Sequence, residues 1–164
     1  MNKRTLLTAL GIAPLLAGCN TLSLFNTLTP KDAARRVAGN IAFGDHPRQT
    51  YDLYAPKGAS DDANLPVLVF FYGGGWNSGS KADYGWMGHA LAALGYLVAI
   101  PDYRLVPEVV YPAFLEDNAA AIKHVMARAA DYGGNAKRLG VIGHSAGAYA
   151  AAMMALAPHY LNEP

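Results

Sequence analysis

Residues 139–156 read LGVIGHSAGAYAAAMMAL. The first four form an apolar run with the length of a short buried strand, and Gly143–Gly147 matches the pattern G-x-S-x-G. The residues from Ala146 to Leu156 are apolar almost all round, which predicts a helix that is covered on most sides. Small residues on both sides of Ser145 suit a sharp turn from strand to helix, because bulky side chains would collide there. We therefore expect a turn that raises the Ser145 hydroxyl away from a sheet. The alternative is a glycine-rich turn without a chemical role.

The residues upstream alternate between predicted strands and predicted helices. Apolar runs over Pro66–Phe71 and Tyr96–Ile100 are typical of strands buried on both faces, and Gln49–Tyr54 alternates like an early antiparallel strand. Helices are predicted over 83–94 and over 112–133, each closed by glycine. This order of elements requires crossover connections and a parallel sheet, so the predicted fold class is α/β.

A second turn, Tyr72-Gly-Gly-Gly-Trp76, follows the first buried strand. Consecutive glycines allow backbone N–H groups to point toward a bound oxygen, as in an oxyanion hole. Loss of one such donor costs about 3 kcal/mol in catalysis. A triple glycine alone is only a turn, but upstream of the turn at Ser145 it indicates acyl transfer.

Five motifs occur in the order of a known family, and together they resemble the esterase and lipase branch of the α/β-hydrolase fold. The resemblance is to enzymes related to feruloyl esterases, kynurenine formamidases and prenylcysteine methylesterases, and it covers about residues 41–160. It implies a serine carboxylesterase-type hydrolase of small acyl esters or related amides, with no cofactor and no metal. The motifs are Tyr72–Trp76, Pro101–Arg104, Tyr111–Asp117, Tyr132–Gly134 and Gly143–Gly147.

The resemblance also implies a role for individual residues. Ser145 would be the nucleophile, and the amides of Gly74, Gly75 and Ala146 would form the oxyanion hole. Many relatives carry His where this sequence has Tyr72, which leaves the effect on the glycine loop open. The charged residues of the neighbouring motifs are expected to brace loops rather than react: Asp102, Arg104, Glu116 and Asp117.

The acid and the histidine of this fold follow the serine in the chain. Here 19 residues follow Ser145, among them His159 and Glu163. The predicted helix is about 18 Å long at about 1.5 Å per residue, so it carries His159 to its far end. His144 is expected to point away from the reacting face. The remaining histidines lie upstream, at positions that the family does not use: His46, His89 and His124.

The sequence is therefore expected to represent the N-terminal part of such a hydrolase, truncated after the helix that follows the serine. Three explanations stay open: a fragment or truncated gene model of an intact enzyme, a degenerate product, and a non-catalytic binding lipoprotein on a degenerate hydrolase fold. By analogy with the family, a missing C-terminal half or a partner chain is expected to pair with the strand Leu139–Ile142. Without it, several apolar side chains of the next helix lack partners: Tyr149, Met153, Met154 and Leu156.

The N-terminus has the pattern of a targeting signal. A basic start is followed by an apolar run that is too short to span a bilayer, and the run ends at Cys19, the only cysteine. The sequence Leu-Ala-Gly-Cys resembles the lipobox of bacterial lipoproteins, which implies lipid attachment at Cys19; an ordinary secretory signal is the alternative. By the same resemblance, Asn20 does not look like a signal for retention in the inner membrane, which favours an anchor in the outer membrane, facing the periplasm. The expected organisation is a signal peptide at 1–18, a tether at 19–40 and the hydrolase part at 41–164.

Composition excludes several other classes. The chain is 52% apolar and 15% charged, which is too apolar for a disordered chain. A net charge of +1 gives no electrostatic footprint for nucleic acid, and a single cysteine allows no internal disulfide or cysteine-rich zinc site. The glycine pattern fits neither type of nucleotide-binding loop. The expected partners are a small-molecule ester and a membrane.

Overall fold

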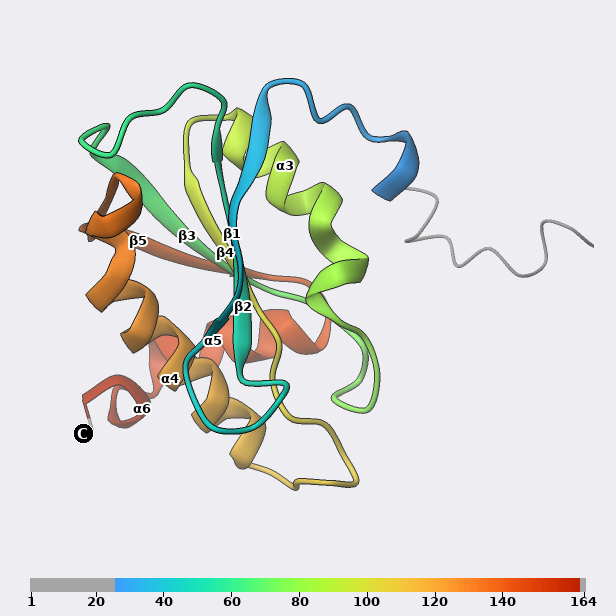
Figure 1. Cartoon of the computed structure of the whole chain (residues 1–164). Helices are drawn as coiled ribbons and strands as arrows, with labels where there is room; N and C mark the ends of the chain where they lie inside the picture. The colour runs from blue at the N-terminus through green and yellow to red at the C-terminus, as the bar shows by residue number, and fades with distance from the viewer. Residues whose placement is uncertain (1–25, 163–164) are drawn as a thin grey trace, which may run out of the picture.

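The structure is a computed structural model that describes residues 26–162. A five-stranded sheet with the order β1-β2-β4-β3-β5 runs through its centre (Figure 1). The pair β3 and β4 and the pair β3 and β5 are parallel, whereas β2 runs antiparallel to both β1 and β4. The strands are β1 (Ala34–Ala42), β2 (Thr50–Pro56), β3 (Leu65–Phe71), β4 (Leu97–Pro101) and β5 (Gly134–Gly143).

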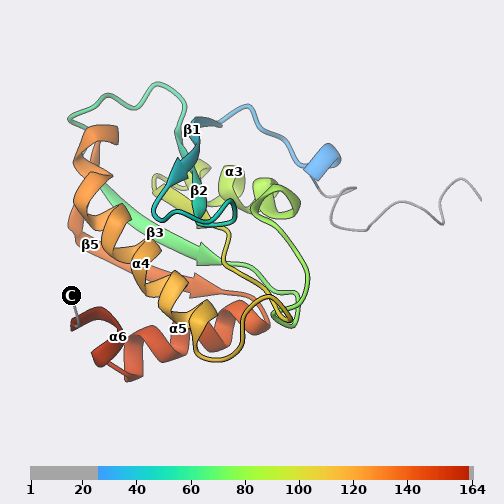
Figure 2. The ribbon, with the colours of Figure 1, turned by 60° about the horizontal axis from the view of Figure 1, so that its bottom comes forward.

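Helices cover both faces of this sheet (Figures 1 and 2). The helix α3 lies on one face, and α4, α5 and α6 lie together on the other. The alternation of strands and helices confirms the predicted α/β class. The helical elements are η1 (Lys81–Tyr84), α3 (Gly85–Ala93), α4 (Ala113–Arg128), η2 (Ala129–Tyr132), α5 (Ala146–Leu156) and α6 (His159–Asn162).

The core lies around the central strands β3 and β4. All five residues of β4 are buried, as its continuous apolar run predicts. The apolar stripe of α4 packs toward the sheet, with Phe114, Ile122 and Val125 all buried. The strand β5 is longer than the predicted 139–142 and only partly buried, because among the described residues it pairs with β3 alone.

The prediction of a tether over 19–40 is wrong from Ala34 onward, because β1 begins there and pairs with β2. Buried Asp52 holds the two strands together, since it accepts hydrogen bonds from the Asn40 amide and from Arg36, both at 2.9 Å. As an edge strand, β1 has several exposed residues, and its polar sequence therefore gave no strand signal.

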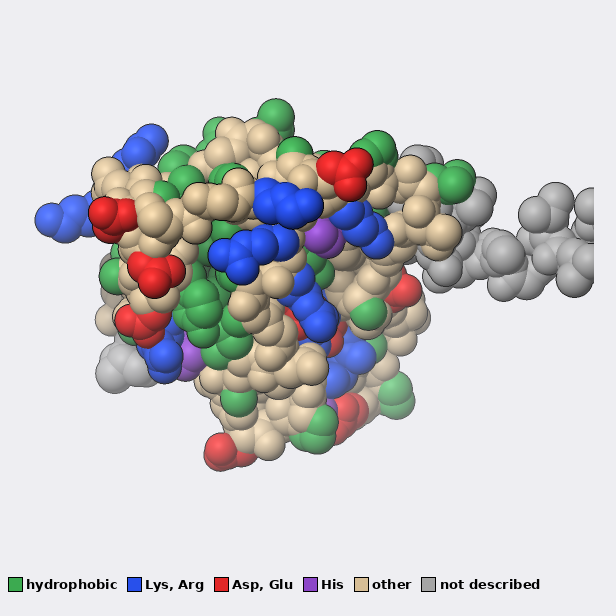
Figure 3. Space-filling view, turned by 45° about the horizontal axis from the view of Figure 1, so that its top comes forward, with side chains coloured by type: hydrophobic (Ala, Val, Ile, Leu, Met, Phe, Trp, Pro, Cys, Tyr) green, Lys and Arg blue, Asp and Glu red, His purple; other side chains and the backbone are tan. Residues whose placement is uncertain are grey.

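The segment before β1 also contacts the domain. The Asn26 side chain donates to the Ala82 carbonyl at 2.5 Å and accepts from the Trp86 amide at 2.6 Å. A cavity of about 580 Å³ lies beside this contact, with Lys31, Arg36 and His89 among its lining residues. Figure 3 shows basic and acidic side chains interspersed with neutral ones on one face of the molecule.

The predicted signal peptide at 1–18 and the predicted lipid site at Cys19 lie outside the described residues. Within residues 26–162, no helix has the length and apolar character needed to cross a membrane.

The helix α5 has the bounds predicted from the sequence, but its side chains are not all without partners. Met154 is buried and Met153 packs against the core, so the expectation was wrong for both. Tyr149 is 43% exposed and contacts the Trp76 ring edge-on, with 5.7 Å between ring centroids. The expectation is confirmed for Leu156, which is 82% exposed.

Candidate active site

The predicted turn between strand and helix is present at the end of β5. Ser145 has φ 53° and ψ −119°, a conformation with positive φ that residues other than glycine rarely adopt and that costs about 1–3 kcal/mol. A Cβ atom at Gly143 would collide with the carbonyl of Gly147, and one at Gly147 would collide with the carbonyl of Phe71. The turn therefore excludes side chains at both glycines, as the sequence predicts.

The glycine loop (residues 72–79) and this turn begin side by side. Phe71 of β3 and Gly143 of β5 are register partners, and the His144 amide donates to the Phe71 carbonyl at 3.0 Å. A Cβ atom at Gly73 would lie 3.0 Å from the Cβ of Ser145, so the backbone of the loop rests directly against the serine.

The glycines that follow form a compact turn. Gly74 has φ 148°, Gly75 has φ 59°, and the Gly74 carbonyl accepts hydrogen bonds from the Asn77 and Ser78 amides. The carbonyl of Gly74 is thus tied inside the turn. The Ala146 amide begins α5, where the first N–H groups of a helix have no intrahelical acceptor. The assignment of the Gly74, Gly75 and Ala146 amides to an oxyanion hole stays a prediction.

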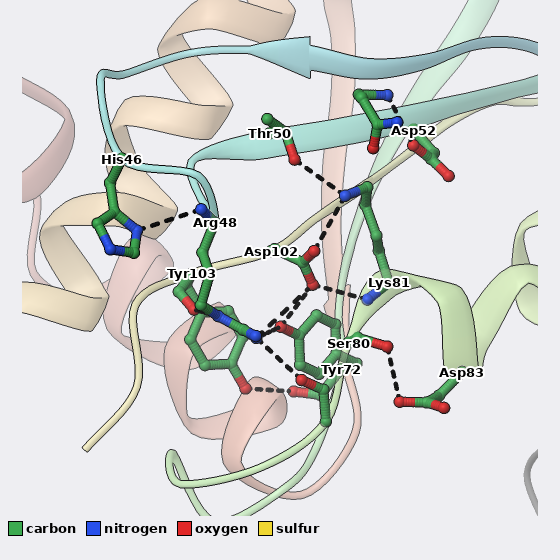
Figure 4. Close-up of polar contacts among 12 residues, drawn as sticks. His46, Arg48, Thr50, Asp52, Tyr72, Ser80, Lys81, Asp83, Asp102 and Tyr103 are labelled. Atoms are coloured by element: carbon green, nitrogen blue, oxygen red, sulfur yellow. Dashed lines mark hydrogen bonds and ion pairs between the residues drawn. The ribbon is translucent and has the colours of Figure 1, made fainter. Parts of the chain in front are cut away.

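Asp102 braces the loop as expected. Its buried carboxylate accepts hydrogen bonds from the Tyr72 hydroxyl at 2.8 Å and from the Lys81 amide at 2.7 Å, and the Lys81 ammonium lies 3.0 Å away (Figure 4). Burial, together with the charge of Asp102, raises the pKa of Tyr72 well above its ordinary value. The phenol therefore stays protonated and keeps donating to the carboxylate.

Arg104 and Asp117 brace a second loop, which also confirms the expectation. Asp117 is 1% exposed and accepts hydrogen bonds from the Arg104 amide at 2.8 Å and from its guanidinium at 2.7 Å. The Gln49 side chain adds a further bond at 2.8 Å. Glu116, in contrast, is exposed on α4 beside a cavity of about 630 Å³.

Three of the histidines contact polar side chains other than Ser145. His144 is 3.0 Å from the Tyr84 hydroxyl, His46 is 2.6 Å from Glu108, and His124 is 3.0 Å from the Tyr51 hydroxyl. Among residues 26–162, no side chain hydrogen-bonds to the Ser145 hydroxyl, and Ser145 is an exposed residue. The part of the chain described thus presents the nucleophile and the glycine loop, and no base in contact with the nucleophile.

Trp76, at the end of the run of three glycines, contacts two other aromatic side chains. Trp76 has φ 62°, stacks on Phe114 with 5.5 Å between ring centroids, and meets Tyr149 edge-on. Tyr84 is 4% exposed and packs between Phe70 and Tyr72, so it belongs to the core and not to a pocket.

Two basic residues at this site were missed at the level of sequence. Arg48 and Lys81 both lie within 3.8 Å of Asp102, although they are 33 residues apart in the chain. Neither belongs to a recognisable motif, because Arg48 lies before β2, Lys81 lies in η1 and Asp102 follows β4, so only the folded chain brings them together.

The fold, the strained serine and the adjacent glycine loop define an α/β-hydrolase of the esterase type. Residues 51–162 match the BD-FAE family model, and the chain belongs to this family of ester hydrolases. Solved structures share its fold. Esterase B of Lactobacillus rhamnosis superimposes with a TM-score of 0.76 at 22% identity, covering 94% of this chain and 50% of the esterase. A bacterial heroin esterase gives 0.70 at 26% identity, over 84% of this chain and 44% of that chain.

Curated relatives are similar in sequence. The carboxylesterase NlhH of Mycobacterium tuberculosis is 43% identical over 105 residues, which cover 63% of this chain and 32% of the relative. The isoprenylcysteine alpha-carbonyl methylesterase ICME of Arabidopsis thaliana is 36% identical over 119 residues, which cover 73% of this chain and 27% of the relative. The chain thus spans about a third or less of the length of these relatives.

Proposed function

We propose that this chain carries the nucleophile and the oxyanion hole of a serine carboxylesterase that hydrolyses small acyl esters or related amides. The observation that carries the proposal is the contact between the glycine loop and the strained serine turn, in which Gly73 lies against Ser145. Membership of an ester hydrolase family supports it.

The chemistry follows from these positions. The Ser145 oxygen attacks the acyl carbonyl and forms a tetrahedral oxyanion, which accepts hydrogen bonds from the amides of Gly74, Gly75 and Ala146. The serine proton passes to a base and then to the leaving alcohol, so an acyl-enzyme forms. Water then attacks the acyl-enzyme, releases the acid and restores the hydroxyl. In this fold the acid and the histidine follow the serine in the chain.

A fluorophosphonate probe tests this proposal on the protein as its own cell produces it. The expected result is labelling at Ser145, which Ser145→Ala abolishes and Ser60→Ala leaves intact. Ser60 is a suitable control because it is exposed in the loop after β2, away from the glycine loop. A folded protein that stays unlabelled would support a non-catalytic binding protein on a hydrolase fold.

We propose in addition that Cys19 is lipidated and anchors the protein to the bacterial cell envelope, at the outer membrane facing the periplasm. The support is the sequence Leu-Ala-Gly-Cys at the end of a signal-like segment. Labelled palmitate is expected to enter the wild-type protein but not Cys19→Ser. A Cys19→Ser variant that stays in the membrane fraction would contradict the anchor.

A further inference from the structure

One arginine contacts both ends of the glycine loop. Arg48 donates a hydrogen bond to the Tyr72 hydroxyl at 2.8 Å, where the loop begins, and to the Gly79 carbonyl at 2.9 Å, where it ends. It also donates to the Tyr103 carbonyl at 2.7 Å, just after β4 (Figure 4). A single planar guanidinium therefore ties residues 72–79 to the segment before β2 and to the segment after β4.

The Asp102 carboxylate also joins the two ends of the loop, next to the contacts of Arg48. It accepts from Tyr72 before the glycines and from Lys81 after them, and its side chain is 10% exposed. Arg48 lies 3.8 Å from the same carboxylate. Hydrogen bonds to charged groups in such a buried setting are roughly twice as strong as neutral ones. The hydrogen bonds of Arg48 and Asp102 hold the two ends of the loop together, so its glycines have little freedom to move.

The size of Tyr72 makes this arrangement possible. Its ring stacks on Tyr103 with 4.8 Å between centroids, and the Tyr103 hydroxyl donates to the Tyr72 carbonyl at 2.9 Å. The phenol reaches from the first residue of the loop to both Arg48 and Asp102.

We propose that Arg48 is a positioning residue for the oxyanion hole, which it holds in register with Ser145 through Tyr72 and Gly79. This inference rests on the proposed esterase function. Oxyanion donors act only when they lie about 2.7–3.1 Å from the developing charge, and a displacement of about 1 Å can cost about 100-fold in rate. Because the oxyanion exists only in the transition state and intermediate, loosening the loop lowers kcat and leaves KM nearly unchanged.

The test compares Arg48→Ala with Arg104→Ala in the natural full-length protein, with p-nitrophenyl acetate as substrate. The two arginines are matched, because their side chains are 27% and 28% exposed and each pairs with a buried aspartate. Arg104 braces a different loop through Asp117. We expect Arg48→Ala to lower kcat at least about tenfold with KM within about twofold. Arg104→Ala leaves the buried Asp117 without its charged partner and costs stability, so kcat is expressed per folded molecule, and we expect it to stay within about twofold.

Two further measurements separate positioning from a general loss of structure. Millimolar guanidinium is expected to restore part of the kcat of Arg48→Ala and to have no effect on Arg104→Ala. Hydrogen exchange at the amides of residues 73–79 is expected to speed up in Arg48→Ala only. Equal losses of kcat in both variants, or unchanged exchange in the loop of Arg48→Ala, would overturn the inference.

If Arg48→Ala does not fold, Tyr72→Phe tests the positioning role instead. It removes one hydroxyl, keeps the ring packing, and leaves Asp102 bonded to Lys81. We expect kcat to fall about threefold at constant KM, and an unchanged kcat would overturn the inference. Fluorophosphonate labelling of Ser145 in the wild type is measured in parallel. A labelled wild type with unaffected variants refutes the role of Arg48 alone, whereas an unlabelled wild type refutes the proposed function and the inference with it.

Discussion

The turn at Ser145 depends on two glycines whose absent side chains leave room for backbone atoms. At Gly147 a methyl group would strike the carbonyl of Phe71, which is held in β3 and cannot move aside. We expect Gly147→Ala to lower the free energy of unfolding by about 3 kcal/mol, since overpacking against rigid backbone costs about that much. Urea denaturation measures the change.

Gly140→Ala is the control for this prediction. Its new methyl group would meet only the flexible end of Leu68, at 3.3 Å. The expected loss is below about 1 kcal/mol, because a side chain can shift by a few tenths of an ångström. An equal loss in both variants would contradict a special steric requirement of the turn at Gly147.

Two histidines give the fold a dependence on pH. Burial lowers the pKa of His89 and of His124, and for His124 the nearby Arg128 lowers it further. A folded-state pKa below the ordinary 6.5 means that the unfolded chain binds protons more readily. Stability is therefore fully present above about pH 6.5 and is lost as the pH falls through the lowered values.

Replacing His124 tests this dependence. We expect His124→Gln to lose less free energy of unfolding than the wild type between pH 7.5 and pH 5, in denaturant titrations at both values. His46→Gln is the control, since His46 is paired with Glu108 near the surface. A pH dependence identical in His124→Gln and the wild type would contradict the assignment.

Most of the residues that bond around the glycine loop could not be found from the sequence. Ser145 and the glycines stand in local patterns that the steric needs of a turn impose, so a short window of sequence suffices for them. Arg48 and Lys81 bond to residues that are distant in the chain, and the two partners of Lys81, Thr50 and Asp102, are neighbours through the register of β2 with β4. A single sequence contains no local signal for such a register.

At the level of elements, the contact between Asp117 and Arg104 fixes the start of α4 to the loop after β4. Asp117 is 1% exposed, and removing it would leave the guanidinium and Gln49 without their acceptor. We expect Asp117→Ala to cost about 3–5 kcal/mol in unfolding free energy, the range for breaking a buried ion pair. Asp131→Ala, at a surface pair with both side chains about half exposed, is expected to change stability far less.

Elements that are buried along most of their length were predicted more accurately than elements that are partly exposed. The apolar segments that became β3, β4 and α5 were predicted within a residue or two, because a buried element is apolar along its length. The edge strand β1 and the first half of β5 were missed. Both are partly exposed, and the Lys137-Arg138 pair in β5 resembles a loop in sequence.

At the scale of the molecule, residues 26–162 leave the β5 edge of the sheet and one face of α5 uncovered. Among the described residues β5 pairs only with β3, and α5 beside it exposes Tyr149 and Leu156. We propose that further strands, from a C-terminal half or a partner chain, cover this side. Residues 20–164 produced alone are accordingly expected to self-associate as concentration rises, as measured by sedimentation velocity.

Leu156→Glu is expected to reduce that association, and Leu94→Glu is its matched control. Leu94 is 73% exposed, against 82% for Leu156, but it follows α3 on the opposite face of the sheet. A monomer at all concentrations, or an equal effect of both substitutions, would show that the exposed face of α5 does not drive the self-association.

The tyrosine at the start of the glycine loop also bears on how the protein tolerates acid. A histidine in that place would gain a positive charge near pH 6.5 and disturb its bonds to a neighbouring arginine. The phenol of Tyr72 carries no charge at any pH a cell encounters, because burial raises its pKa. Tyr72 thus keeps one protonation state from weakly acidic to alkaline medium, and its bonds to Arg48 and Asp102 add no sensitivity to acid of their own.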